Sequence, residues 1–380
     1  MEMPGLHKRA KKDRRANAPS KGAVAAEQLK VPFPEIDLPI HPPFPPMEAR
    51  SADEIPSGNN WLYEPKWDGF RCLAFRKGNE VLLQSKSGQP LGRYFPEMVE
   101  ALRQLPKKQF VLDGELVIIS GGKLAFDDLL MRIHPAESRI RKLSRKTPAS
   151  YLVFDLLVDE KGHSLVKRPL AERWRALGDF FQGIAPSSIR RSPATTDLTE
   201  AQHWMADLSG SGFDGVIAKC LDLPYTSGER TGMVKIKNIR SADCVVGGFR
   251  YASTGKGIGS LLLGLYNDDG LLNHVGFTSS FNSTIRATLK PIVEKLEGGS
   301  GFTGNAPGGP SRWSTERSGE WIPLKPKLVC EVTYDHFSGG RFRHGTKFLR
   351  WRPDKDPKLC TYEQLAGKDR RTLREFGLTA

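Results

Sequence analysis

The chain has 380 residues, and its 57 lysines and arginines outnumber its 43 aspartates and glutamates, which gives a formal net charge of +14. This length suffices for two ordinary domains, and no apolar run approaches the ~20 residues that cross a bilayer. The basic N-terminus is not followed by an apolar stretch, which excludes a secretory signal. We therefore expect a soluble, cytoplasmic protein. The positive charge favours a polyanionic partner, nucleic acid above all, although a solvated basic surface would give the same balance.

The cysteines indicate reduced thiols rather than a metal or disulfide framework. They are odd in number and scattered, and no two of them form a C-x-x-C pair: Cys72, Cys220, Cys244, Cys330 and Cys360. Zinc sites and redox pairs need closely spaced cysteines, so both are unlikely on spacing alone.

The first predicted unit is an N-terminal arm over residues 1–56. Its first 30 residues are polar and basic, a composition typical of disorder. Prolines recur from Val31 to Pro56, which favours an extended leader without a core of its own.

A mixed α/β domain is predicted over residues 57–240. Short apolar runs rich in β-formers indicate strands, and two helical patterns fall between them. The strands are expected at Phe70–Phe75, Val81–Gln84, Phe110–Ile119, Tyr151–Val158 and Phe213–Ala218, and the helices at Pro96–Leu105 and Leu170–Phe181.

A second domain is predicted over residues 241–360, followed by a tail over 361–380. Candidate strands are followed by one helix capped by Asn282 or Ser283 and then by further strands, an order that suits a small barrel of the OB kind. A generic α+β domain would give a similar pattern. The expected strands are Cys244–Arg250, Ser260–Tyr266, Leu271–Thr278 and Leu328–Phe337.

The most informative motif surrounds Lys66. Together with Asp68, Gly69 and Arg71, this lysine forms the pattern K-x-D-G-x-R, which arises by chance about once in several hundred such chains. A lysine beside a turn is ordinarily a surface residue. It becomes a nucleophile when burial or neighbouring cations lower its pKa. Lys66 is therefore the candidate nucleophile, with Asp68 beside it.

Three further segments place polar groups at apolar strands. Asp113 and Glu115 suit a hard cation or a ribose hydroxyl. Phe154 lies in a buried run and could stack on a base, although such a ring is usually core. Asp214 and Lys219 lie at the two ends of another strand. For each segment, a strand with polar ends is the alternative interpretation.

Two lysines alternate on a strand near residue 235. Side chains alternate in strands, so Lys235 and Lys237 share one face, where they would grip a phosphate and lower the pKa of a nearby lysine. An exposed edge strand would have the same pattern. Near the C-terminal end, arginines and aromatic rings alternate around Arg352, Asp354 and Lys355. This composition suits contact with phosphates, and a solvated basic tail is the alternative interpretation.

Taken together, these motifs resemble the covalent nucleotidyltransferases, which comprise DNA ligases, RNA ligases and mRNA capping enzymes. The resemblance extends from Trp61 to Lys355 and is nearest to the small bacterial ATP-dependent DNA ligases of the ligase C and ligase D kind. It implies an α+β core in which a nucleotidyltransferase domain precedes an OB barrel. It also implies ATP-dependent sealing of DNA nicks through AMP carried covalently on Lys66.

The resemblance also implies roles for individual side chains. Arg71 would contact the nucleotide or the nick phosphate, Phe154 would stack on adenine, and the backbone of Glu64 would read the edge of that base. A divalent cation, Mg²⁺ or Mn²⁺, would be held by Glu115 and Asp214.

Several basic residues are assigned to phosphates in the same way. Lys235 and Lys237 would hold the α-phosphate of ATP, and Lys219 would also contact the nucleotide. Arg352, Asp354 and Lys355 of the OB domain would orient pyrophosphate.

The chain departs from the family pattern at two positions. Asp214 stands where the family usually has glutamate, which keeps the charge but shortens the reach of the carboxylate. Lys86 stands where arginine is frequent, which keeps the charge but loses the bidentate fork.

The alternatives are an RNA ligase, a capping-type enzyme, or a nucleic-acid-binding protein with a degenerate site. The expected partner is nicked double-stranded DNA, together with a repair polymerase or a DNA end-binding protein. We further expect a monomer that acts in DNA repair at the bacterial nucleoid.

Overall fold

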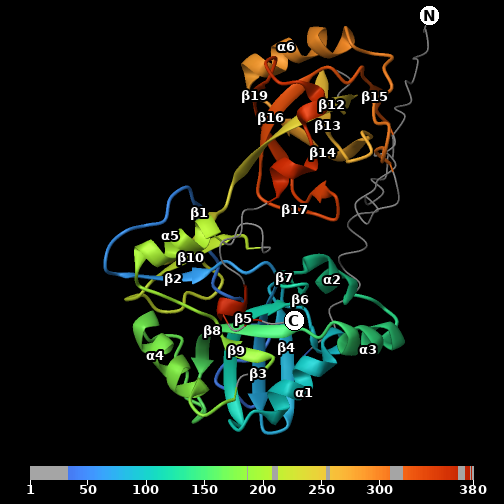
Figure 1. Ribbon diagram of the computed structural model, residues 1–380. Coiled ribbons are helices and arrows are strands. Elements are labelled where there is room, and N and C mark those ends of the chain that lie inside the picture. Colours follow the sequence, from blue (N-terminus) through green and yellow to red (C-terminus); the bar gives the residue numbers. More distant parts are fainter. Residues whose placement is uncertain are drawn as a thin grey trace, which may run out of the picture.

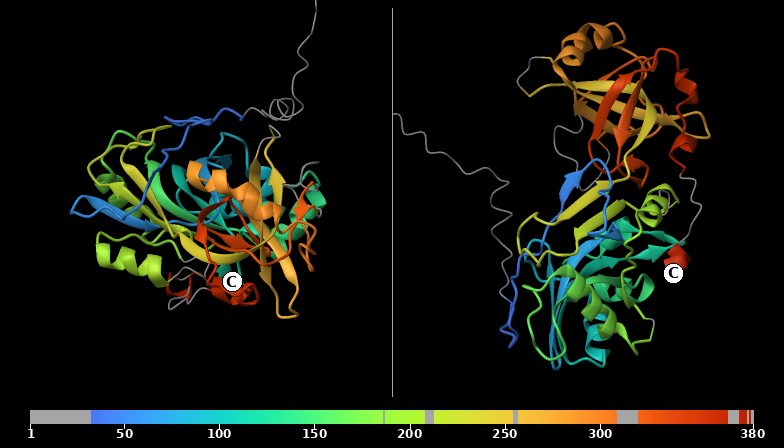
Figure 2. Two further views of the ribbon diagram at one scale, coloured as in Figure 1. Left: turned by 90° about the horizontal axis from the view of Figure 1, so that it is seen from above. Right: turned by 90° about the vertical axis from the view of Figure 1, so that its left-hand side faces the viewer.

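The protein folds into two lobes that are joined by the long strand β12 (Figures 1 and 2). The computed structural model describes residues 33–185, 187–207, 213–253, 257–308, 320–366, 373–376 and 378. The first lobe contains two sheets with helices around them, and the second is a barrel with one helix. The predicted α+β class is therefore confirmed. The basic segment over residues 1–32 lies outside the described residues.

A five-stranded sheet forms the base of the first lobe. Its strand order is β4-β3-β5-β8-β9, antiparallel except where β8 meets β9. Helices α1 and α4 bury Met98, Leu102, Leu177 and Phe180 against it. The bounds are β3 (Phe70–Lys77), β4 (Glu80–Ser85), β5 (Gln109–Val117), β8 (Ser150–Val158), β9 (Ile189–Arg191), α1 (Pro96–Gln104) and α4 (Leu170–Phe181).

A four-stranded sheet with the order β1-β11-β10-β2 completes the first lobe. Helix α5 (Leu198–Asp207) packs on it and buries Ala201 and Trp204 beside Val216 and Val234. The strands are β1 (Arg50–Ala52), β2 (Trp61–Pro65), β10 (Gly215–Cys220) and β11 (Met233–Lys237). Smaller elements follow the large sheet: β6 (Ile119–Ser120), β7 (Lys123–Leu124), α2 (Phe126–Met131) and α3 (Glu137–Lys146).

The proline-rich leader packs on the first lobe, which differs from the predicted arm. Ile36, Leu38 and Met47 are buried in a cluster with residues of β3 and β8. Gln84 donates to the backbone carbonyl of Phe44 at 2.7 Å and accepts from its amide at 2.8 Å. The leader then enters the small sheet as β1, parallel to β11. Residues 33–56 therefore have a core to pack on, which the local composition could not reveal.

The second lobe is the predicted OB-type barrel. It closes because β12 pairs with both β13 and β16, while β19 pairs with both β14 and β16. Helix α6 starts after Asn282, whose side chain accepts a hydrogen bond from the amide of Ile285 at 2.8 Å, as the capping pattern predicts. The remaining bounds are β12 (Arg240–Tyr251), β13 (Ile258–Tyr266), β14 (Leu272–Ser280), α6 (Ser283–Glu294), β15 (Ile322–Pro323), β16 (Val329–Tyr334), β17 (Phe337–Ser338), β18 (Arg341–Phe342) and β19 (Thr346–Trp351).

The C-terminal tail contacts both lobes. A 3-10 turn at Tyr362–Leu365 lies against the barrel, where Gln364 accepts from the amide of Asp243 at 2.8 Å. Leu373 and Leu378 are buried in the first lobe beside Trp67. Within the described residues, no helix is both long and apolar enough to cross a membrane.

Candidate active site

Lys66 follows β2 in a loop that two glycines allow to form. Its amide donates to the carbonyl of Gly215 at 2.8 Å, and its own carbonyl accepts from the amide of Asp214 at 3.2 Å. Gly215 has φ of 138°, and a Cβ there would collide with the carbonyl oxygen of Ile236; a Cβ on Gly69 would collide with that of Leu116. The Asp68-Gly69 and Asp214-Gly215 pairs therefore pack the Lys66 loop against neighbouring strands.

Lys66 opens onto a cavity of about 210 Å³ between the two sheets of the first lobe. Most of the predicted nucleotide-binding residues line this cavity, and the leader forms part of its wall. The lining includes Glu64, Lys66, Arg71, Lys86, Glu115, Phe154, Lys219 and Lys235, together with Pro46, Met47, Glu48 and Ala49 of the leader. Residues from seven separated segments therefore converge where the sequence motifs predict a nucleotide.

Phe154 presents its ring to two cations at the wall of this cavity. The guanidinium carbon of Arg71 lies 4.6 Å from the ring centroid, and the ammonium nitrogen of Lys219 lies 4.3 Å from it. Lys219 is in turn held by the Glu64 carboxylate at 2.8 Å. The Glu64 side chain thus orients a cation, a contact that the backbone role assigned to this residue did not include.

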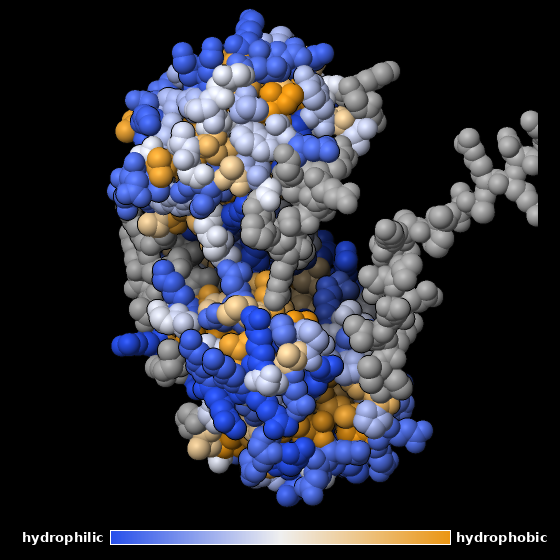
Figure 3. Space-filling view, turned by 90° about the vertical axis from the view of Figure 1, so that its right-hand side faces the viewer, coloured by the Kyte–Doolittle hydropathy of each residue, from blue (hydrophilic) through white to orange (hydrophobic). Residues whose placement is uncertain are grey.

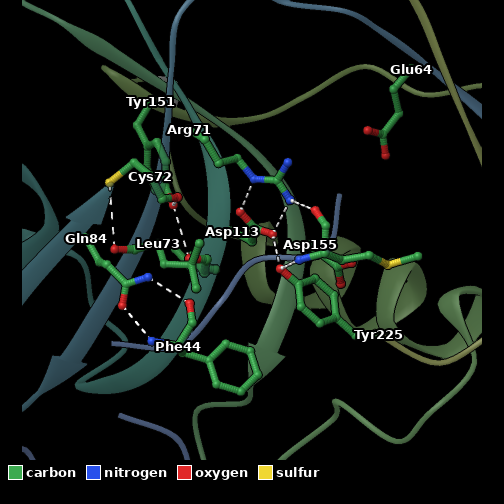
Figure 4. A network of polar contacts seen from close by, with 12 residues as sticks. Phe44, Glu64, Arg71, Cys72, Leu73, Gln84, Asp113, Tyr151, Asp155 and Tyr225 are labelled. Carbon is green, nitrogen blue, oxygen red and sulfur yellow. Dashed lines mark hydrogen bonds and ion pairs between the residues drawn. The ribbon is translucent and has the colours of Figure 1, made fainter. Parts of the chain in front are cut away.

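Arg71 is fixed by a buried carboxylate behind the cavity (Figure 4). Its Nε and Nη2 each donate to Asp113 at 2.6 Å, and the Tyr225 hydroxyl donates to the same carboxylate at 2.6 Å. The amide of Met47 donates to the Tyr225 oxygen at 2.9 Å, which ties the leader to this network. Asp113 is fully buried and engaged with Arg71, so it does not provide the metal ligand that its sequence position suggested.

Glu115 and Asp214 are carboxylates whose pKa values are shifted in opposite directions. Burial raises the pKa of Glu115 to about 8, and the positive charges of Arg71 and Lys66 only partly offset this effect. Burial also opposes the charge of Asp214, but its contacts with His336 and Lys66 hold the pKa of that carboxyl well below its usual range. Asp214 Oδ2 accepts from Lys66 Nζ at 2.5 Å. Glu115 therefore lacks a full counter-charge, whereas Asp214 has one.

The two lysines of β11 share one face, as the alternation predicts, but only one reaches the cavity. Lys235 lines the cavity, and its pKa is lowered by burial, by Lys237 and by Lys66. Lys237 instead donates to Asp335 of the second lobe at 2.7 Å. Lys86, at the mouth of the cavity, pairs with Glu48 at 3.0 Å.

The second lobe brings a different set of residues to Lys66 than the motifs predict. Asp335, His336 and Arg343 reach the site. Arg343 belongs to the arginine–aromatic run Arg341-Phe342-Arg343, a composition that suits phosphate contact, whereas Asp335 and His336 were not singled out from the sequence. Arg352 instead pairs with Asp243 at 2.9 Å and with Asp354 at 2.8 Å, and Lys355 lies 3.9 Å from Asp243. In this arrangement, Arg352, Asp354 and Lys355 are not brought to the cavity.

An enclosed lysine with lysine, arginine, carboxylate and aromatic neighbours, followed by an OB barrel, defines a covalent nucleotidyltransferase. The ATP dependent DNA ligase domain family matches residues 46–237, and the ATP dependent DNA ligase C terminal region matches residues 254–355. The chain belongs to the ATP-dependent DNA ligases.

Individual relatives agree with this membership. The chain is 45% identical over 340 residues to DNA ligase C1 of Mycolicibacterium smegmatis, covering 87% of this chain and 96% of that protein. It is 43% identical over 350 residues to DNA ligase C of Mycobacterium tuberculosis, with the same coverage. A solved structure of a Lig E DNA ligase shares the fold with a TM-score of 0.51 at 15% identity, covering 81% of this chain and 99% of that one.

Proposed function

We propose that this ligase seals nicks in duplex DNA through AMP carried on Lys66. Lys66 Nζ attacks the α-phosphorus of ATP as a neutral amine; a P–N bond forms, one N–H proton is released, and the P–O bond to pyrophosphate breaks. The terminal phosphate at the nick then attacks the same phosphorus, and Lys66 leaves as an amine that takes up a proton. Finally the 3′-hydroxyl attacks the 5′-phosphorus, losing its proton, and AMP departs. The cavity at Lys66, with the cation Lys235 beside it, is the observation that carries this proposal.

Electrostatic stabilisation of phosphoryl oxygens is the main demand of such a reaction. Lys235 and Lys237 suit the α-phosphate because they leave the same face of β11. Arg71 is preorganised by Asp113 for a nucleotide or nick phosphate, and Phe154 offers an aromatic surface for adenine.

We propose that the site takes a divalent cation, Mg²⁺ or Mn²⁺, because ligand atoms of Asp68, Asp214 and His336 lie within 4.8 Å of one another beside Lys66. Glu115 and Asp214 would hold it, and the raised pKa of Glu115 indicates a carboxylate whose charge still needs a cation. Bound there, the cation would neutralise charge on phosphate oxygens. The residues of the chain would orient the nucleotide around it.

Lys66→Ala should abolish covalent labelling with ATP, because no other group replaces its amine. Lys77→Ala is the matched control, since Lys77 is a partly exposed lysine on the same lobe that pairs with Asp37 at 3.4 Å. Labelling of protein with radioactive ATP or GTP is the measurement. Labelling of the Lys66 variant, or labelling by GTP alone, would contradict the proposal.

Sealing assays on matched nicked substrates test which nucleic acid the enzyme prefers. We expect DNA duplexes to be sealed faster than RNA or hybrid duplexes, and preference for RNA would favour an RNA ligase. The net charge of +14 supports a polyanionic partner. We place the enzyme in bacterial DNA repair at the nucleoid, as a monomer supplied with nicks by a repair polymerase or an end-binding protein.

A further inference from the structure

One turn of the OB barrel reaches into the site around Lys66. Strand β16 ends at Tyr334, and Asp335 and His336 form the turn before the hairpin of β17 and β18. This hairpin closes through Gly339 and Gly340, whose φ angles of 56° and 76° suit a tight two-residue turn. Arg343 follows the hairpin and lies over the Phe126 ring of α2, with its guanidinium carbon 3.5 Å from the ring centroid. The hairpin is thereby seated on the first lobe.

Asp335 forms an ion pair with the ammonium group of Lys237. The two side chains pair at 2.7 Å, and both are largely shielded from solvent, with exposures of 16% and 33%. An ammonium group that is paired with a carboxylate must release it before it can hold a phosphate with full strength. Asp335 and a nucleotide phosphate therefore compete for Lys237.

His336 lies between the two carboxylates that flank the nucleophile. Its Nδ1 is 3.4 Å from Asp214 Oδ1, and its Nε2 is 3.9 Å from Asp68 Oδ2. Arg343 also engages Asp68, with Nη2 donating to Oδ1 at 2.9 Å. Asp214 also accepts from Lys66 Nζ, so the imidazole and the ammonium group share one carboxylate.

These contacts are incompatible with the needs of the first chemical step. Attack on ATP requires Lys66 and Lys237 at the α-phosphate and space for the departing pyrophosphate. The residues that resemblance assigns to pyrophosphate are meanwhile engaged with Asp243 inside the second lobe. The docked turn therefore belongs to the steps that follow loss of pyrophosphate.

We propose, resting on the reaction proposed above, that Asp335 and His336 are positioning residues for nick sealing and are dispensable for adenylation of Lys66. Asp335 takes over Lys237 as the AMP phosphate leaves it. His336 holds Asp68 and Asp214 in place while the nick ends react. Neither residue forms or breaks a covalent bond.

Step-resolved kinetics test this proposal in the full chain. For Asp335→Asn and His336→Ala, we expect adenylation by ATP to be no slower than in the parent protein, because the docked turn competes with the nucleotide for Lys237. Single-turnover sealing by pre-adenylated enzyme, and sealing of a pre-adenylated nick, should slow about tenfold or more, which is about 1.4 kcal/mol of barrier. Asp335→Glu and His336→Gln, which keep the charge or a donor, should recover part of the rate.

His163→Ala is the matched control, because His163 pairs with Asp159 at 3.2 Å on an exposed part of the first lobe. It should leave all three rates unchanged. Faster adenylation of the Asp335 and His336 variants with normal sealing would show that the turn only plugs an empty site. Equal rates in every step, or an equal slowing of every step, would also overturn the proposal. Failure of the parent protein to take up AMP would instead refute the reaction at Lys66.

Discussion

The pKa of Glu115, which lines the cavity, depends on both the burial of its carboxyl group and the charges nearby. It lies on β5 directly opposite Arg71 of β3, in register across the antiparallel pair. Even with this cation and Lys66 nearby, burial raises its pKa to about 8 from an ordinary value of 4.5. Between about pH 4.5 and about pH 8, the carboxyl group of Glu115 binds more protons in the folded protein than in the unfolded chain. The contribution of Glu115 to the free energy of unfolding therefore falls as the pH rises from about 4.5 to about 8.

Glu115→Gln should remove this pH dependence, because glutamine does not titrate. In the absence of nucleotide and metal, the variant should gain stability relative to the parent protein as the pH rises. Urea unfolding midpoints at about pH 5.5 and about pH 8.5 measure the effect. Glu172→Gln is the control, because the Glu172 side chain of α4 is 49% exposed. Parallel pH profiles for the Glu115 variant and the parent would contradict the assigned pKa.

At the residue scale, several residues of the local sequence motifs lie together at the cavity. Lys66 and Arg71 lie within six positions, and one loop and one strand carry them. The hydrogen-bond partners of these residues depend on long-range packing and were not predictable from local motifs. Asp113 has the same local pattern as Glu115, but in the structure it is engaged by Arg71 and Tyr225. Only the long-range packing that brings Tyr225 to β5 distinguishes the two carboxylates.

The leader is the element whose role the sequence obscured most. Its prolines indicate an extended chain without a core of its own, but its few apolar side chains are buried against β3 and β8. Tyr225 links the leader to the nucleotide site, because its hydroxyl contacts both the amide of Met47 and the carboxylate of Asp113. The Tyr225 ring also stacks with that of Phe44, with centroids 6.2 Å apart.

Tyr225→Phe should weaken the attachment of the leader to the first lobe without creating a cavity in the core. Losing a buried hydroxyl that makes two hydrogen bonds should cost about 1 to 2 kcal/mol of stability. Because Met47 and Arg71 both line the cavity, the KM for ATP in adenylation should rise more than kcat falls. Urea unfolding and the ATP dependence of adenylation measure these effects. Tyr251→Phe is the control, since that ring is 39% exposed on the barrel; equal responses of both variants would contradict a link to the site.

Two other elements show features of secondary structure that the sequence patterns did not predict. The apolar run Leu328–Phe337 predicts one strand, but the chain turns at Asp335 and His336, and those two residues reach the active site. Helix α3 has Ile140 as its buried residue among exposed charges, so its apolar stripe is too thin to predict. The Glu137–Arg141 pair and basic residues in its last turn favour the helix instead.

At the scale of the whole molecule, the lobes are connected by more than the strand β12. The turn at Asp335 and His336 meets the first lobe at Lys66, and the C-terminal tail returns to that lobe on the other side of the nucleophile loop. Trp67, next to Lys66, lies under this tail, and the Phe376 ring contacts it with centroids 6.1 Å apart. Hydrophilic residues predominate over both lobes on the face shown in Figure 3. Leu373, Phe376 and Leu378 of the tail form an apolar contact with Trp67 on the first lobe.

Leu373→Ala tests whether the tail contributes to the stability of the closed molecule. Leu373 is fully buried beside Trp67 and Leu378, so truncating it should cost about 2 to 5 kcal/mol and lower the thermal midpoint. Leu359→Ala is the matched control, because Leu359 precedes the same tail and is 62% exposed. Thermal unfolding followed by tryptophan fluorescence should report the change at Trp67. If both variants unfold at the temperature of the parent protein, the tail does not hold the lobes, and the hairpin at Lys66 carries that role alone.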